Sequence, residues 1–70
     1  MMDKKQAIYD LVNSFQGVIY MNYYATTGIY KLKVIFNNEA GEQEKYTTMS
    51  ADEPTAYAVM YDKIQRNRNL

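Results

Sequence analysis

Residues 29–36 read Ile29-Tyr30-Lys31-Leu32-Lys33-Val34-Ile35-Phe36, and this stretch decides the fold. Its even-numbered side chains are apolar or aromatic and point to one side of an extended chain, whereas Lys31 and Lys33 point to the other. Such alternation is typical of a strand with one face in the core and one face in solvent. The stretch therefore predicts a half-buried β-strand at 29–36.

A turn is expected directly after this strand, at residues 37–42. Asn37, Asn38 and Gly41 are residue types that readily adopt the left-handed backbone conformations of tight turns. The chain should then reverse, so residues 43–49 are expected to form a strand beside the first. The rest of the chain must cover one face of this hairpin.

The segment before the strands has the spacing of an amphipathic helix at about residues 3–15. Its apolar side chains recur at i, i+3, i+4 and i+7, which places them on one helical face. These residues are Ile8, Leu11, Val12 and Phe15. Asp3 is expected to cap the N-terminus, and Gly17 is expected to take the left-handed position that ends the helix.

Residues 18–24 are rich in β-branched and aromatic side chains and are expected to form another strand. One of its faces would carry Ile19, Met21 and Tyr23. The opposite face includes the Asn22 amide, which would need a hydrogen-bond partner if it were buried. We therefore expect the first face in the core, and the short loop that follows makes the three strands an antiparallel meander.

A second helix is expected at about residues 53–66. Two starts fit the sequence, because Ser50 and Glu53 have capping-box spacing, while Pro54 suits the first helical position. The apolar stripe of this helix would be Ala56, Val59, Met60 and Ile64, with Tyr57 and Tyr61 on its flank. The basic residues at the end of the helix are expected to fray.

These elements predict one α+β domain over residues 1–70. Its order is helix, three-stranded antiparallel meander, helix, with both helices packed on one face of the sheet. Nothing in the chain remains to cover the opposite sheet face. That uncovered face is therefore the most informative surface for function.

The composition removes most of the usual catalytic and metal-binding groups. The chain has no cysteine and no histidine, so Cys/His zinc sites and Ser-His or Cys-His catalytic pairs cannot form. We expect no enzyme activity, no cofactor and no metal site. Because the polar first residues run straight into the helical pattern, we also expect no signal peptide, no membrane partner and a cytoplasmic location.

Candidate binding residues come from the excess of tyrosine and from uneven charge. Eight tyrosines are too many for so small a core, and Tyr20 and Tyr24 are expected on the uncovered sheet face with Lys31 and Lys33. Acidic residues gather around the predicted hairpin turn, although the formal net charge of the chain is zero. The candidate binding residues are Tyr20, Tyr24, Lys31, Lys33, Glu39, Glu42 and Glu44.

Three interpretations of these residues remain open. The tyrosines can replace Phe and Trp in the core with their hydroxyl groups at the water boundary. They can instead form a protein interface, or a platform on which single-stranded nucleic acid stacks. The zero net charge argues against the last interpretation, since nucleic-acid-binding domains normally carry a basic excess.

The predicted element order resembles two groups of proteins. The spacing Ala56-x-x-Val59-Met60-x-x-Lys63-Ile64 looks like the packing helix of the double-stranded-RNA-binding domain. That family contacts RNA through a basic start of this helix, whereas this chain has Ser50-Ala51-Asp52-Glu53-Pro54, so RNA binding does not carry over.

The chain also resembles small phage-encoded inhibitors of CRISPR nucleases. Some of these place an amphipathic helix before a three-stranded sheet, and the turn Asn37-Asn38-Glu39-Ala40-Gly41 is the most specific piece of the likeness. This resemblance implies a phage or mobile-element inhibitor that binds and blocks a larger host protein. We therefore expect a small protein-interaction module, with self-association into a homodimer through the uncovered sheet face. The alternative is a sequence-tolerant nucleic-acid-binding domain that uses the sheet-face tyrosines and lysines.

Overall fold

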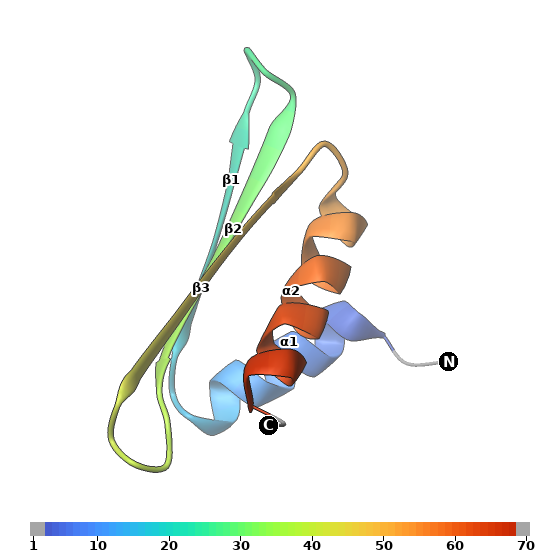
Figure 1. Ribbon diagram of the computed structural model, residues 1–70. Helices are drawn as coiled ribbons and strands as arrows, with labels where there is room; N and C mark the ends of the chain where they lie inside the picture. The colour runs from blue at the N-terminus through green and yellow to red at the C-terminus, as the bar shows by residue number, and fades with distance from the viewer. Residues whose placement is uncertain (1–2, 69–70) are drawn as a thin grey trace.

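The computed structural model describes residues 3–68, and its elements follow the expected order (Figure 1). They are α1 (Lys4–Ser14), β1 (Val18–Tyr24), β2 (Ile29–Asn37), β3 (Gln43–Ser50) and α2 (Glu53–Arg68). The predicted α+β class with a helix, a three-stranded meander and a helix is confirmed.

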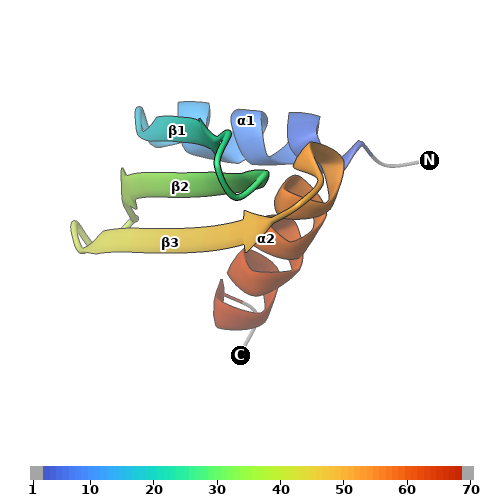
Figure 2. The ribbon, with the colours of Figure 1, turned by 90° about the horizontal axis from the view of Figure 1, so that it is seen from above.

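The three strands form one antiparallel sheet in the order β1-β2-β3. Figures 1 and 2 show both helices on the same face of this sheet. Helix α1 packs on β1 and β2, α2 packs on β2 and β3, and the two helices also contact each other. The other face of the sheet is not covered by any element of residues 3–68.

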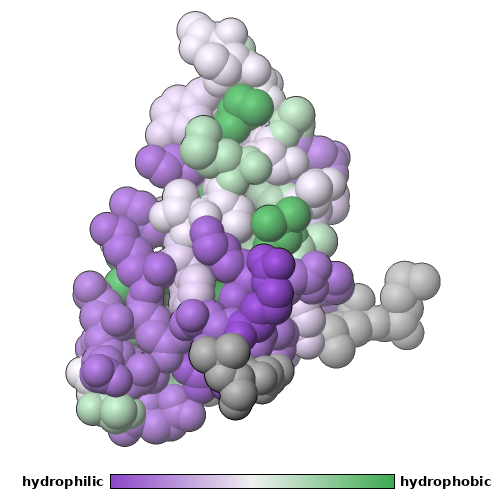
Figure 3. Space-filling view, viewed as in Figure 1, coloured by the Kyte–Doolittle hydropathy of each residue, from purple (hydrophilic) through white to green (hydrophobic). Residues whose placement is uncertain are grey.

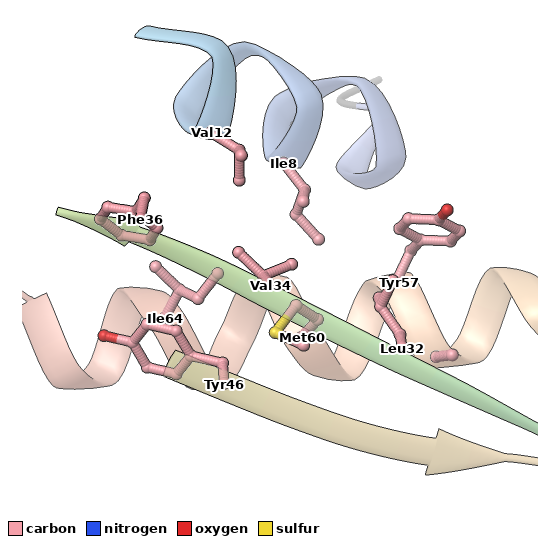
Figure 4. Close-up of a cluster of buried hydrophobic side chains, with 10 residues drawn as sticks. Ile8, Val12, Leu32, Val34, Phe36, Tyr46, Tyr57, Met60 and Ile64 are labelled. Atoms are coloured by element: carbon pink, nitrogen blue, oxygen red, sulfur yellow. The ribbon is translucent and has the colours of Figure 1, made fainter. Parts of the chain in front are cut away.

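The core lies between the sheet and the two helices (Figure 4). Strand β2 supplies Leu32, Val34 and Phe36, which is the row expected from the alternating pattern. Helix α1 adds Ile8 and Val12. The remaining buried apolar residues are Tyr46, Ala56, Tyr57, Met60 and Ile64. The central strand thus organises the core because both helices and both neighbouring strands meet on it.

The bounds of α1 agree with the sequence prediction, but the residue with the left-handed backbone at its end does not. Asp3 is the N-cap, since its carboxylate accepts hydrogen bonds from the backbone N–H groups of Lys5 and Gln6. The residue with the left-handed backbone is Gln16 (φ 55°), so the expectation for Gly17 was wrong. Gly17 instead donates its N–H to Val12 O at 2.9 Å, which completes a Schellman motif one residue beyond Gln16.

Gly17 is needed for close packing rather than for a left-handed turn. A Cβ atom at this position would lie 2.5 Å from the carbonyl oxygen of Ile35 and 2.6 Å from Cβ of Phe36. The chain between α1 and β1 therefore runs against the β2 backbone, and only a residue without a side chain fits there.

Asp52 caps the start of α2. Its carboxylate accepts a hydrogen bond of 3.1 Å from the Thr55 N–H, and the helix begins at Glu53 with Pro54 as its second residue. Ser50 accepts a hydrogen bond from the Asp52 N–H, so it holds the cap in place instead of capping the helix itself. The helix continues through Arg68, two residues beyond the expected end.

The buried side of α2 is rotated about the helix axis toward α1, compared with the apolar stripe that the sequence predicts. Tyr57 was expected on the flank but is 3% exposed, and its hydroxyl lies 3.1 Å from that of Tyr9 in α1. Val59 was expected in the stripe but is exposed. The cause is the second helix, because α1 packs beside α2 on the Tyr57 side and leaves Val59 on the opposite side.

Tyr23 corrects the prediction for β1. Ile19 and Met21 are half-buried against the core as expected, but Tyr23 on the same side of the strand is 55% exposed. Figure 1 shows the reason, since the β1–β2 hairpin extends past the helical layer. Tyr23 there packs on Tyr30 of the neighbouring strand, with 4.6 Å between ring centroids.

Candidate functional site

The candidate binding surface is the uncovered side of the sheet, which we call the open face. Strand alternation places Tyr20 and Tyr24 of β1 there, with exposed fractions of 51% and 44%. Lys33 pairs with Tyr20 across the β1–β2 ladder, and Lys31 pairs with Asn22. Tyr20, Asn22, Lys31 and Lys33 line a single shallow hollow. Three of the four sheet residues that the sequence singled out, Tyr20, Lys31 and Lys33, thus line one hollow, and Tyr24 lies on the same face opposite Ile29.

The β2–β3 register adds residues to the open face that sequence reasoning missed. Lys45 pairs with Ile35, and Met49 pairs with Lys31, so both point away from the helices. Met49 is exposed at the end of the surface. The sequence could have shown the place of Lys45, because side chains alternate along a strand. If Tyr46 points into the core, its neighbour Lys45 must point outward.

All the charged side chains of the open face are positive. Lys31, Lys33 and Lys45 lie on it, and none of the outward positions in the three strands holds an aspartate or glutamate. Within residues 3–68, none of these three lysines forms an ion pair with an acidic side chain. The open face therefore carries a local positive charge although the chain as a whole has a formal net charge of zero.

The acidic candidates lie elsewhere, around the β2–β3 turn. Both carboxylate oxygens of Glu39 accept hydrogen bonds of 3.0 Å from Nη2 of Arg68, and Oε2 of Glu44 accepts one of 2.8 Å from Nη1. Glu44 also accepts hydrogen bonds from the Tyr46 hydroxyl at 2.6 Å and from the Asn38 amide at 2.8 Å. We call this group of side chains the Arg68 cluster.

The Arg68 cluster holds its carboxylates in the charged form. Burial opposes ionisation of Glu44, but hydrogen bonds from Tyr46 and Asn38 and the charge of Arg68 keep the pKa of this carboxyl below its usual value. A backbone hydrogen bond and the contact with Arg68 lower the pKa of Glu39. Both acids are thus partnered inside the chain, whereas Glu42 is exposed at the turn.

The Arg68 cluster also ties three parts of the fold together. The guanidinium of Arg68 lies over the rings of Phe15 and Phe36, at 5.3 and 5.6 Å from their centroids. Asn67 donates a hydrogen bond of 2.8 Å to the Tyr46 hydroxyl. In Figure 3 hydrophilic residues gather over this end of the molecule, where the β2–β3 turn and the end of α2 lie. The basic end of α2, expected to fray, is therefore an ordered part of the structure up to Arg68.

The eight tyrosines divide between the core and the surface. Tyr46 and Tyr57 are buried, and Tyr9, Tyr30 and Tyr61 are half-buried. The three exposed ones, Tyr20, Tyr23 and Tyr24, all belong to β1. The interpretation that tyrosine only replaces other aromatic residues in the core thus accounts for part of the set and leaves the β1 tyrosines to be explained.

No three acidic side chains of residues 3–68 converge in an arrangement that could hold a metal ion. Neither α1 nor α2 has the length and apolar run that a membrane crossing would need. Comparison with protein-family models, with curated proteins and with solved structures finds no match to this chain.

Proposed function

We propose that the chain is a protein-interaction module that binds an acidic surface of a larger protein through its open face. The observation that carries the proposal is the placement of exposed Tyr20 and Tyr24 on the same sheet face as Lys31, Lys33 and Lys45, with no acidic residue at the outward positions of the strands. A flat surface of this composition has the aromatic contact area and the single charge sign that suit a protein partner of opposite charge.

The two kinds of side chain have different tasks in this proposal. Tyrosine buries a large area at low cost in side-chain entropy, so Tyr20 and Tyr24 supply the residence time of the complex. The lysines attract an acidic partner from a distance and raise the association rate at low salt. The acids of the Arg68 cluster contribute little, because Glu39 and Glu44 are engaged by Arg68.

An inhibitory role is the form of this function that the sequence resemblance supports. A chain of 70 residues that occupies the surface of an enzyme blocks access to that surface without chemistry of its own. The proposal therefore includes an inhibitor of phage or mobile-element origin that acts in the cytoplasm and has no catalytic activity. The absence of cysteine fits a reducing compartment.

A second candidate function is binding of single-stranded nucleic acid, and one observation favours it. Tyr20 and Tyr24 lie in the same row of β1, beside lysines that could contact phosphates, which is the arrangement of a base-stacking platform. The zero net charge of the chain favours the protein partner, because a nucleic-acid-binding domain normally has a basic excess.

The deciding experiment measures both ligand classes with matched variants. The chain is immobilised and exposed to host lysate, and recovered proteins are compared between the wild type and the double variant Tyr20→Ala/Tyr24→Ala. Val59→Ala on the exposed side of α2 is the control. We expect an acidic protein that is lost with the tyrosine variant and retained with the control.

The same proteins are then titrated with mixed-sequence single-stranded and double-stranded oligonucleotides at increasing salt. We expect no binding at low salt. Tight binding with a steep log–log salt slope that Lys31→Ala and Lys33→Ala each flatten by roughly one unit would overturn the protein-partner proposal.

A further inference from the structure

The free edge of β1 is the least protected part of the sheet. β1 pairs only with β2, so its other edge has no strand beside it within residues 3–68. Its sequence Val18-Ile19-Tyr20-Met21-Asn22-Tyr23-Tyr24 contains neither a charged residue nor a proline. Proteins usually protect an edge strand with charges, prolines or bulges, because bare backbone groups there pair with another strand.

The opposite edge of the sheet, formed by β3, does have such protection. It contains Glu44 and Lys45, and the Lys63 side chain of α2 donates a hydrogen bond of 3.0 Å to the carbonyl oxygen of Thr47. The two edges of one small sheet thus differ sharply. The β1 edge is therefore the one that is open to pairing with a further strand.

We propose that this occupant is a second copy of the chain, paired antiparallel along β1 with a two-fold axis through Met21. This pairing joins the two three-stranded sheets into one and places both open faces on the same side. In this register Tyr20 lies opposite Asn22 of the other copy, and Ile19 lies opposite Tyr23.

The sequence of β1 is suited to pairing with itself. A two-fold axis at Met21 keeps each row of side chains together, so core-side residues meet core-side residues and open-face residues meet open-face residues. No like charges meet across the axis, because the strand has none. The nearest lysines, on β2, would be three strand spacings from those of the other copy, roughly 14 Å, which exceeds the Debye length of about 8 Å at physiological salt.

The pairing also accounts for the exposure of Tyr23. Its partner position, Ile19, is half-buried beneath α1, so Tyr23 of one copy would lie beside the α1 helix of the other. Tyr9 faces α2, where its ring packs on Tyr57. Leu11 is two residues further along α1, about 200° around the helix, so it lies on the flank away from α2, where it is half-buried. Tyr23 and Leu11 are therefore the apolar side chains that the second copy would cover.

The dimer should be a reversible one. A pair of seven-residue strands with a few side-chain contacts buries less than the roughly 1,200 Å² of a standard stable interface. We expect the mass measured by sedimentation equilibrium to rise from monomer at low micromolar concentration to dimer near millimolar concentration. A constant monomer mass over this range would overturn the proposal.

A pair of charge variants tests the interface, and the thermal transition of each variant shows whether its monomer stays folded. In Tyr20→Glu/Asn22→Glu each new carboxylate lies across from a lysine of the same chain, Lys33 or Lys31, which supports the fold. In the dimer, however, the two carboxylates of one copy face those of the other. We expect at least a tenfold weaker dimer, and a native thermal transition that is retained.

The matched variant is Tyr20→Glu/Asn22→Lys, which changes the same positions but places opposite charges across the two-fold axis. Its new lysine lies across from Lys31 of the same chain, so its native thermal transition is checked first. We expect this protein to dimerise at least tenfold more tightly than the double-glutamate variant. Equal self-association of the two variants would assign the dimer to another surface and overturn the proposal.

A cysteine placed on the axis tests the register. The chain has no cysteine of its own, and antiparallel partners have Cα atoms about 4.5–5.5 Å apart, within the range that a disulfide spans. We expect Met21→Cys to form a covalent dimer under mild oxidation much faster than Lys45→Cys on the β3 side. Equal rates for the two variants would contradict pairing along β1.

Discussion

At the scale of single residues, the junction between α1 and β1 shows two positions with opposite requirements. Gln16 has a left-handed backbone that glycine would adopt more easily, while Gly17 has an ordinary backbone but no room for a side chain. The glycine and the left-handed residue are therefore adjacent but not the same. Substitutions at the two positions should change stability in opposite directions.

Gly17→Ala should lower the free energy of unfolding by about 1–3 kcal/mol, because the added methyl group would have to displace the Ile35 carbonyl or the Phe36 side chain. Urea denaturation followed by circular dichroism measures the change. The comparison is Gly28→Ala, where a new Cβ meets nothing within 4 Å and any loss comes from the strain of a left-handed backbone with φ 69°. An unchanged urea midpoint for Gly17→Ala would contradict the close contact between Gly17 and the β2 backbone.

Gln16→Gly should raise the free energy of unfolding by up to about 1 kcal/mol. A non-glycine residue pays a steric cost in the left-handed region, and glycine at this position of a Schellman motif removes it. Thermal melts of this variant and of Asn13→Gly, which lies within α1, give the comparison. The same substitution should be destabilising at Asn13, since a glycine inside a helix lowers its stability.

At the scale of elements, the Arg68 cluster fixes the end of α2 to the β2–β3 turn and to α1. Arg68→Ala removes the hydrogen bonds to Glu39 and Glu44 and the cover over Phe15 and Phe36. We expect a loss of about 1–2 kcal/mol of unfolding free energy.

Arg68→Lys should recover only a small part of this loss, because lysine has neither the planar fork nor the ring contact of arginine. Chemical denaturation of the two variants and the wild type gives the comparison. Wild-type stability in Arg68→Lys would show that only the charge matters.

The same cluster makes stability depend on pH in acid. The folded-state pKa of Glu44 lies below that of an unfolded-chain glutamate, about 4.3, so the unfolded chain binds more protons in this range. The stabilisation is fully present above about pH 4.3 and is lost as pH falls through the folded-state pKa. Glu44→Gln should flatten the pH dependence of the unfolding free energy below about pH 4.3, which urea denaturation of the variant and the wild type at a series of acid pH values measures.

At the scale of the whole molecule, one layer of helices on one sheet face leaves a single core that all elements share. Val34 is completely buried at its centre, whereas Val59 is exposed on α2. Val34→Asp should unfold the chain, because an unpaired carboxylate at that position has no water and no partner. Val59→Asp should keep a native thermal transition, and a similar loss in both variants would contradict the placement of the core.

The arrangement of the elements also places two charged regions that are close in the sequence on different parts of the molecule. The open face has lysines without acids, and the acids around the β2–β3 turn have Arg68 as their partner. A partner approaching the sheet therefore meets positive charge, although the chain is neutral overall. This separation supports the proposal of a partner with an acidic surface.

The sequence by itself determined the elements, their order and most of their ends, because these depend on residues within a few positions of each other. Alternation defined β2 and its buried row, and Asp3 defined the start of α1 because it caps the helix that directly follows it. Four of the seven candidate binding residues, Tyr20, Tyr24, Lys31 and Lys33, were also found by alternation, and the strand register places them on one face of the sheet.

Only the tertiary structure decided what depends on the placement of one element against another. The position of α1 beside α2 buried Tyr57 and exposed Val59, and the reach of the β1–β2 hairpin past the helices exposed Tyr23. The β2–β3 register brought Lys45 to the open face, and the length of α2 brought Arg68 to Glu44. A periodic pattern states which side of an element is apolar, but how much of that side is covered depends on neighbours distant in the chain.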